Sequence, residues 1–309
     1  MNDSADRPKE PASLVGAIAG AMRPSQWIKN VFVLVPLLFA GPTLREQGLF
    51  GASLWLRVLA GMGVFCLASS ATYILNDISD IDADRAHPVK RNRPIASGAL
   101  PVRKAYQSCA VLLLLALAGA GAVGNTFSAC IVLYLLQNVA YSRILKHVAW
   151  VDTAMIAFGF VLRIVAGGEA AGVPLSHWLL ATTGLLALFL ALGKRKHEQL
   201  TTDAQHRSAL TGYHPVALTA ALWLSAALAG AAYAGYALDP QTAARFHTSA
   251  LPITIPLPIL GLSRFAWLIN RPGAAHSPTE RMLRDPWFLG IAGCGGALIL
   301  AVVYGWIGQ

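Results

Sequence analysis

Charged residues are scarce in this chain. Asp, Glu, Lys and Arg make up 13% of its 309 residues, about half of the roughly 25% found in soluble globular domains. In their place, 55% of the residues are hydrophobic and the mean hydropathy is +0.54. Apolar runs close to the ~20 residues needed to cross a bilayer recur from Trp27 to Trp306. Because these runs are continuous and not alternating, the sequence predicts an all-α polytopic membrane protein rather than a β-barrel.

Other common signals are also missing. The polar start, MNDSADRPKEPASL, lacks the basic region and apolar core of a cleavable signal peptide. We therefore expect residues 1–22 to be a cytoplasmic tail. No linker or change in composition divides the rest, so residues 23–309 are expected to form a single transmembrane domain. Cysteine is rare and forms no CxxC or His-linked motif, which predicts core thiols at Cys66, Cys109, Cys130 and Cys294.

The distribution of positive charge predicts the topology. The apolar runs indicate about nine transmembrane helices, at roughly 27–42, 56–75, 104–124, 126–141, 149–170, 176–193, 214–237, 250–269 and 286–307. With the N-terminus cytoplasmic, 20 of the 24 Lys and Arg residues fall on that side, against only Arg45, Arg57 and Arg245 opposite. This asymmetry explains the net charge of +9 without a nucleic-acid partner. We expect a multi-pass protein of the plasma (inner) membrane.

The densest charge lies in YILNDISDIDADRAHPVKRNRPIASG, residues 73–98, at the cytoplasmic end of the second predicted span. Asn76, Asp80 and Asp84 recur every four residues, which on a helix places them on one face. Like charges held close together repel one another, and Mg²⁺ relieves the repulsion by taking oxygen ligands. The spacing therefore predicts a Mg²⁺–diphosphate site, with Asp77 beside it. The alternative is a solvated, Asp-rich loop.

A basic cluster follows these acids directly. It consists of Arg85, Lys90, Arg91 and Arg93. A polyanionic ligand needs carboxylates that hold a metal ion, and it needs cations that bind the phosphate charge the metal does not neutralise. Positive-inside topology alone accounts for some of these cations, but it does not account for the acids.

The segment NDISDIDADRAHPVKRNRPIASG resembles the NDxxDxxxD motif of the UbiA-type intramembrane prenyltransferases. The segments RPSQWIKN, YSRILKHVAWVD, LRIVAGGEAAGVPLSHW and LALGKRKHEQL are similar, more narrowly, to those of its polyprenyl-phosphate (decaprenyl-phosphate) phosphoribosyltransferases. The resemblance is specific from Arg23 to Leu200. It implies a nine-helix bundle with a cytoplasm-facing cavity, and related enzymes suggest a homotrimer.

The resemblance also implies an activity. Such enzymes transfer 5-phosphoribosyl from phosphoribosyl diphosphate to a polyprenyl phosphate, and the product feeds arabinose-containing cell-envelope glycans. In this chain Asn76, Asp80 and Asp84 would hold Mg²⁺, with Asp80 and Asp84 the main catalytic candidates. Asp77 would support the metal or the substrate.

Further candidates lie near the ends of other spans. Lys29, in RPSQWIKN, suits either a phosphate ligand or an ordinary interfacial anchor. Tyr141 and Lys146 match the subfamily pattern, although positive-inside loops commonly look like this. Asp152 and Arg163 are ionisable residues inside a span, where charge is costly and faces a cavity or a partner. Arg163 is equally compatible with a structural role.

The segment GKRKHEQL carries the last candidates, Lys194, Arg195 and Glu198. Lys194 and Glu198 are expected to be catalytic and Arg195 to bind substrate, and a plain i,i+4 pair of Lys194 and Glu198 is the alternative. Many UbiA-type aromatic prenyltransferases have a second Asp-rich motif here. A basic segment favours a phosphate-bearing substrate over an aromatic one. The alternatives are an aromatic prenyltransferase of quinone or haem biosynthesis and, less well supported, a transporter.

Overall fold

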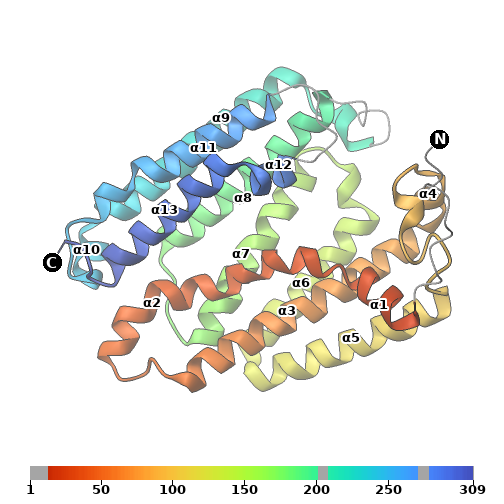
Figure 1. Cartoon of the computed structure of the whole chain (residues 1–309), viewed down its shortest axis with the longest axis horizontal. Coiled ribbons are helices and arrows are strands. Elements are labelled where there is room, and N and C mark those ends of the chain that lie inside the picture. The colour runs from red at the N-terminus through yellow and green to blue at the C-terminus, as the bar shows by residue number, and fades with distance from the viewer. Residues whose placement is uncertain (1–12, 201–207, 271–277, 309) are drawn as a thin grey trace, which may run out of the picture. The chain divides into compact units, whose positions relative to one another are not determined.

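Every element of regular structure in the described residues is a helix (Figure 1). The computed structural model describes residues 13–200, 208–270 and 278–308. Within these ranges eight helices are long and apolar enough to cross a membrane. The prediction of an all-α polytopic membrane protein is confirmed. The eight segments are Pro24–Glu46, Ala52–Ser79, Val102–Val123, Val151–Ala171, His177–Leu200, Pro215–Leu238, Leu251–Ile269 and Pro286–Val303.

The ninth expected span, at roughly 126–141, corresponds to helix α6, Asn125–Arg143. This helix is not among the eight. Its sequence includes Gln137, Asn138 and Arg143, and such polar residues lower its hydropathy. The structure therefore shows a helix where the sequence predicts one, but with a weaker apolar character than its neighbours.

The chain divides into two compact units, each formed from two separate segments. The first unit comprises residues 1–31 and 59–139, and the second comprises 32–58 and 140–309. Helices of the first unit are α1 (Leu14–Met22), α4 (Ile81–Ala86), the 3-10 turn η2 (Lys90–Asn92) and α5 (Val102–Val123). The 3-10 helix η1 (Pro24–Leu34), α3 (Ala52–Ser79) and α6 continue from one unit into the other.

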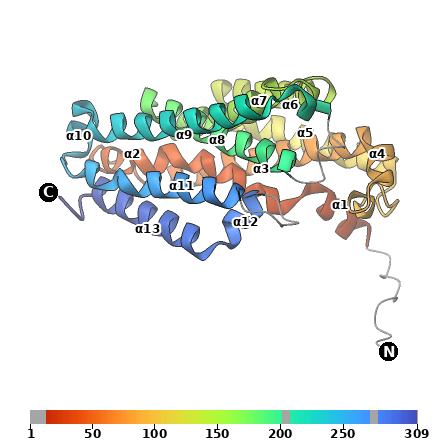
Figure 2. The same ribbon diagram turned by 90° about the horizontal axis from the view of Figure 1, so that it is seen from above.

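The second unit holds the remaining elements. They are α2 (Val35–Glu46), η3 (Leu145–His147), α7 (Val151–Ala171), α8 (His177–Leu200), η5 (Ser208–Gly212), α9 (Pro215–Leu238), α10 (Pro240–Phe246), η6 (Leu251–Thr254), α11 (Pro256–Ile269), α12 (Pro278–Arg284) and α13 (Pro286–Val303). Helix α8 packs along α9, and α11 packs along α13 (Figures 1 and 2).

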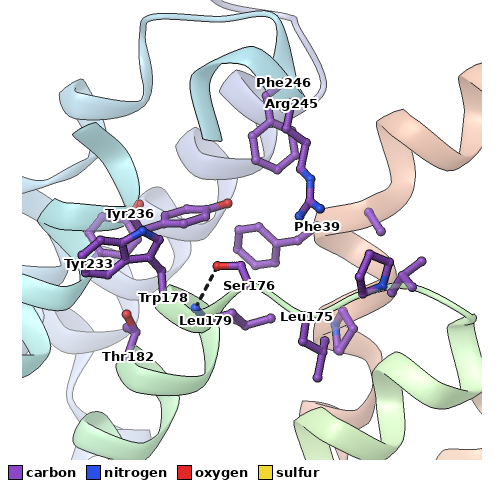
Figure 3. A pocket seen from close by; sticks show the side chains of 14 residues that line it. Phe39, Leu175, Ser176, Trp178, Leu179, Thr182, Tyr233, Tyr236, Arg245 and Phe246 are labelled. Carbon is purple, nitrogen blue, oxygen red and sulfur yellow. Dashed lines mark hydrogen bonds between the residues drawn. The ribbon is translucent and has the colours of Figure 1, made fainter. Parts of the chain in front are cut away.

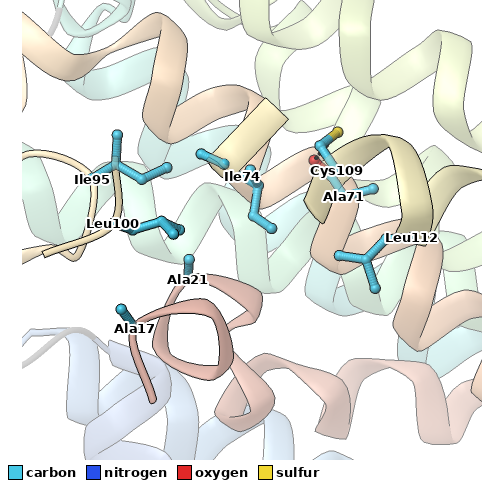
Figure 4. Packing of buried hydrophobic residues seen from close by; sticks show 9 residues of the cluster. Ala17, Ala21, Ala71, Ile74, Ile95, Leu100, Cys109 and Leu112 are labelled. Atoms are coloured by element: carbon cyan, nitrogen blue, oxygen red, sulfur yellow. Dashed lines mark hydrogen bonds between the residues drawn. The ribbon is translucent and has the colours of Figure 1, made fainter. Parts of the chain in front are cut away.

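The core of the first unit joins α1, α3 and α5 (Figure 4). Ala17 and Ala21 lie one turn apart on α1 and are buried, because small side chains let this helix approach the others closely. The thiol of Cys109 on α5 donates a hydrogen bond to the carbonyl of Ala71 on α3 over 3.6 Å. Helix α1 lies within residues 1–22, for which the sequence predicts only a tail, and residues 1–12 lie outside the described residues.

The helices of the second unit pack through a buried apolar cluster and through a close contact at a glycine. Phe189 and Leu192 of α8 pack with Phe265 of α11 in one buried cluster. Gly167 on α7 faces the backbone of Val33 so closely that any Cβ would overlap its carbonyl oxygen. These contacts hold α7 and α8, which carry the charged residues described below.

All four cysteines are free, as the sequence predicts. Cys66, Cys109 and Cys130 are buried. Cys294 on α13 is exposed, which corrects the expectation that every thiol lies in the core. The apolar run around Cys294 marks a helix, but hydropathy alone does not distinguish a core-facing position from an outward-facing one.

Candidate active site

The acidic motif lies where α3 gives way to the short helix α4. Asp80 sits between the two helices. Its backbone N–H donates to the carbonyl of Asn76 over 2.9 Å, and the N–H of Asp84 donates to the carbonyl of Asp80 over 2.8 Å. These i,i+4 hydrogen bonds stack Asn76, Asp80 and Asp84 on successive turns. The backbone therefore places these three residues at successive helical turns, as the spacing predicts.

Arg93 ties two of the predicted acids together. Its Nη1 lies 2.6 Å from Asp84 Oδ2 and 3.2 Å from Asp77 Oδ1. Asp77 and Asp84 are only 2% and 3% exposed, so the guanidinium offsets a like-charge repulsion that water would not screen. The basic cluster therefore supplies the counter-charge of the acidic motif as well as cations that could face a ligand.

Arg23 completes this network and was not among the predicted site residues. Its Nη2 lies 2.5 Å from Asp77 Oδ1, and its guanidinium stands 5.1 Å from the centre of the Tyr73 ring. Arg23 ends α1 with a φ of 53°, in the left-handed region that non-glycine residues seldom adopt. The signal in the sequence was its place at the head of RPSQWIKN, which carries part of the family resemblance.

The other cations of the segment point outward. Arg85 donates through Nε to the carbonyl of Ala96 over 3.2 Å and lies 3.8 Å from the exposed Asp82. Lys90 and Arg91 are exposed. In the described residues, no group of three or more His, Cys, Asp or Glu side chains is placed to hold a metal. The predicted metal ligands are an amide and two carboxylates. They fit Mg²⁺, which usually combines one or two carboxylates with substrate phosphates and water.

A second charged cluster lies in the second unit, where the first turn of α7 meets the last turns of α8. Arg195 Nε lies 2.8 Å from Asp152 Oδ2, and the two side chains are 1% and 0% exposed. The two atoms meet without hydrogen-bond geometry, and neither has a hydrogen-bond partner elsewhere in the described chain. Arg195 Nη1 also pairs with Glu198 one turn away.

Tyr213 is the fourth member of this cluster. Its hydroxyl donates to Asp152 Oδ1 and accepts from the backbone N–H of Trp150 over 2.9 Å. Burial, and then the hydrogen bond to the Asp152 carboxylate, raise the pKa of Tyr213 to about 12. The tyrosine therefore stays neutral at physiological pH. Trp150, which precedes α7 with a φ of 69°, is held in this strained conformation beside the Tyr213 ring.

The predicted residues of the second unit divide into those that the structure brings together and those that it does not. Asp152, Arg195 and Glu198 share the buried cluster. Tyr141 is half-buried on α6. Arg163 is 6% exposed and donates to the carbonyl of Gly159 over 2.9 Å, in its own helix.

Three predicted lysines lie elsewhere on the chain. Lys29 is half-buried on η1, Lys146 is half-buried on η3, and Lys194 is half-buried on α8 next to Arg195. Sequence reasoning missed Tyr213 as well as Arg23. It also missed the pairing of Asp152 with Arg195, because the partners are far apart in the chain and only the packing of α8 against α7 brings them together.

Fold and sequence together define an intramembrane prenyltransferase. Residues 33–284 match the UbiA prenyltransferase family, and the chain belongs to that family. It is 36% identical to the decaprenyl-phosphate phosphoribosyltransferase of Mycobacterium tuberculosis (strain ATCC 25618 / H37Rv), covering 89% of this chain and 90% of the relative. The corresponding enzyme of Mycolicibacterium smegmatis is also 36% identical, over 89% and 88%.

A solved structure shows the same fold. The UbiA homolog from Archaeoglobus fulgidus bound to GPP and Mg²⁺ superimposes with a TM-score of 0.69 at 18% identity, covering 94% of this chain and 99% of that one. The predicted UbiA-like fold is therefore confirmed. The family includes members whose structures hold Mg²⁺.

Proposed function

We propose that this protein transfers the 5-phosphoribosyl group of phosphoribosyl diphosphate to a polyprenyl phosphate and releases diphosphate. The observation that carries the proposal is the 36% identity, over about nine-tenths of both chains, to relatives named decaprenyl-phosphate phosphoribosyltransferase. The basic segment around Lys194, in place of a second Asp-rich motif, supports a phosphate-bearing partner over an aromatic one.

The acidic motif suits the donor diphosphate. Asn76, Asp80 and Asp84 would hold Mg²⁺, which, when bound, supplies positive charge to the departing diphosphate. Arg93 orients the Asp84 carboxylate by pairing with it at 2.6 Å. The exposed Lys90 and Arg91 are available to phosphate oxygens that the metal does not reach.

The chemical step replaces one C–O bond by another. The bond from the anomeric carbon to the diphosphate breaks with its electron pair leaving on oxygen, and a phosphate oxygen of the polyprenyl phosphate forms the new bond. The acceptor is already anionic near neutral pH, so the chain need not supply a strong general base. We infer that it contributes mainly by positioning the two anions and by stabilising charge.

The buried cluster of the second unit has a positioning role in this proposal. Arg195 is enclosed, so we assign it the task of orienting Asp152 and Glu198. Lys194, half-buried beside it, is the better placed of the two to meet a substrate phosphate. Substrate contacts by Lys29, Tyr141, Lys146 and Arg163 stay predictions.

The excess of Lys and Arg on one set of loops supports a plasma (inner) membrane protein with its N-terminus and active site cytoplasmic. Resemblance to related enzymes supports a homotrimer. Mass measurement of the purified protein in detergent tests the assembly: a trimeric mass is expected, and a monomeric or dimeric mass contradicts it.

The activity is tested by giving membranes that carry the protein radiolabelled phosphoribosyl diphosphate, Mg²⁺ and a polyprenyl phosphate. We expect label in the lipid fraction, lost when the divalent metal is chelated. Membranes without the protein are the control. An unlabelled lipid fraction, together with turnover of a prenyl diphosphate and an aromatic acid, would show that the chain is an aromatic prenyltransferase instead.

A further inference from the structure

The turn that joins α6 to α7 carries Lys146 and ends in a strained residue. Lys146 is the middle residue of η3, which lies within this turn. Trp150, the last residue before α7, has a φ of 69° and a ψ of −42°. A bulky residue rarely adopts a positive φ, and such a conformation persists only where the surrounding structure enforces it. Strain of this kind is concentrated at functional sites, so the contacts that hold Trp150 indicate what the turn does.

Tyr213 holds this strained residue in place. Its hydroxyl accepts the backbone N–H of Trp150 over 2.9 Å and donates to Asp152 Oδ1. The rings of Tyr213 and Trp150 lie with their centres 4.9 Å apart. On the other side of the residue, the carbonyl of Trp150 accepts from the hydroxyl of Thr153 over 2.9 Å. Both backbone polar groups of Trp150 are therefore fixed by side chains.

Tyr213 is itself anchored to the end of α8. Its carbonyl accepts a hydrogen bond from Gln199 Nε2 over 2.8 Å. The 3-10 helix η5, which precedes Tyr213, lies against η3. A Cβ added at Gly212 would lie only 2.8 Å from the Cβ of Ala149, so the two segments are in close contact. One tyrosine thus connects the end of α8, the turn and the first residues of α7.

We propose that Tyr213 is a positioning residue for phosphoribosyl transfer, which fixes this turn so that Lys146 meets a substrate phosphate. The inference rests on the proposed function and on the predicted contact of Lys146 with substrate. Lys146 lies four positions before Trp150, and within this short turn the N–H of Val148 donates to the carbonyl of Leu145 over 3.2 Å. A displacement of Trp150 is therefore passed on to Lys146. A misplacement of about 1 Å can lower a rate about 100-fold.

The Tyr213 hydroxyl is enclosed and does not reach the reacting atoms. Tyr213 is 2% exposed, and the Asp152 carboxylate that accepts its proton is 0% exposed. The second oxygen of Asp152 faces Arg195. A general acid or base must come within hydrogen-bond reach of the substrate. The hydroxyl therefore acts through the turn and not by proton transfer.

The test compares Tyr213→Phe with Lys146→Ala in the label assay, with KM and kcat measured for both substrates. Tyr213→Phe keeps the ring beside Trp150 and removes only the hydroxyl. We expect it to raise the KM of the substrate whose KM Lys146→Ala raises by at least about fivefold, with kcat changed less than about twofold. In the double variant, kcat/KM should be no lower than in Lys146→Ala alone, because the hydroxyl acts through that lysine. Additive losses of kcat/KM, or a higher KM for the other substrate, would overturn the proposal.

Tyr233→Phe is the matched control. Tyr233 is another buried tyrosine of the second unit, and its hydroxyl forms a hydrogen bond of 2.7 Å with that of Thr254. It lies about 27 Å along α9 from the end that follows Tyr213, and it lines a cavity of about 130 Å³ that Lys146 and Trp150 do not line (Figure 3). This variant should lose stability without a change in either KM. Equal changes of KM in the two tyrosine variants would show a general effect of losing a buried hydroxyl and would refute the positioning role.

Hydrogen exchange in residues 144–152 separates this inference from the proposed function. The backbone N–H of Trp150 should exchange faster in Tyr213→Phe, because its acceptor is gone, and at the normal rate in Tyr233→Phe. An unchanged rate in Tyr213→Phe would show that the hydroxyl does not hold the turn, whatever the activity. Absence of label transfer by the unmodified protein would overturn the proposed function and the role of Lys146 with it, whereas the exchange rate alone decides whether Tyr213 fixes the turn.

Discussion

Arg195 and Asp152 form an ion pair in which both side chains are almost completely buried, although 43 positions separate them in the chain. The pair lies at 2.8 Å, with exposures of 1% and 0%. Neither charge is solvated by water, so each depends on the other and on Glu198 and Tyr213 around them. The pair therefore couples the start of α7 to the end of α8.

This coupling predicts a large but non-additive loss of stability. Arg195→Gln leaves Asp152 buried without its counter-charge, and Asp152→Asn does the reverse, so each should cost about 3–5 kcal/mol. The double variant Asp152→Asn/Arg195→Gln should lose clearly less than the sum of the two. Thermal unfolding in detergent measures the cycle. Glu198→Gln, at a side chain that is 15% exposed, should cost less than either single change. Additive losses in the double variant would contradict a direct pair.

The acidic motif predicts a sharp contrast between neighbouring aspartates. Asp80→Ala and Asp84→Ala should each lower phosphoribosyl transfer by more than about 100-fold, because they remove charge from the metal and diphosphate site. Asp82→Ala is the control, since that side chain is 95% exposed and should leave the rate unchanged. The label assay measures activity, and thermal unfolding confirms that each variant is folded. Full activity of both the Asp80 and Asp84 variants would remove the metal-site argument.

Arg93 predicts opposite effects on two ligands. Arg93→Gln removes positive charge from Asp77 and Asp84, so the acids should attract a divalent cation more strongly and the donor diphosphate less strongly. The expected result is a lower half-saturating Mg²⁺ concentration together with a higher KM for phosphoribosyl diphosphate. Arg93→Lys, which keeps the charge but not the forked geometry, should show smaller changes. If the half-saturating Mg²⁺ concentration and the KM for phosphoribosyl diphosphate changed in the same direction, this charge-balancing role of Arg93 would be refuted.

Tyr213 predicts a loss of stability in alkali. Its pKa is raised to about 12 from an ordinary value of 10.0. Between these two pH values the folded protein binds more protons than the unfolded chain. The contribution of the Tyr213 hydroxyl to the free energy of unfolding is therefore complete below pH 10 and is lost as the pH rises toward 12. The temperature of thermal unfolding should decrease less steeply with rising pH in Tyr213→Phe than in the unmodified protein. Identical slopes would show that this hydroxyl does not titrate with unfolding.

A close helix contact predicts which glycine tolerates a methyl group. Gly167→Ala should destabilise the second unit by about 1–3 kcal/mol, since the added Cβ meets the rigid backbone carbonyl of Val33. Gly290→Ala, on α13 where nothing lies within 4 Å of the added atom, should be neutral or stabilising. Thermal unfolding in detergent compares the two. Equal stability of both variants would show that α7 and Val33 separate easily.

Local features of this protein were determined by the sequence itself. The apolar runs predict helices close to their observed positions, because span length depends on hydropathy and bilayer thickness. The four-residue spacing of Asn76, Asp80 and Asp84 predicts their stacking on successive turns, because helical geometry is local. The thiol of Cys294 was expected in the core but is exposed, because an apolar run predicts the helix and not which way each side chain faces.

The partners of the charged residues were decided only by the tertiary structure. Arg23 reaches Asp77 across 54 positions, and Tyr213 reaches Asp152 across 61. Any of several cations in each loop could have satisfied these acids by charge alone. The choice depends on which helices pack together and at what depth, because a buried charge must find a partner within a few ångströms.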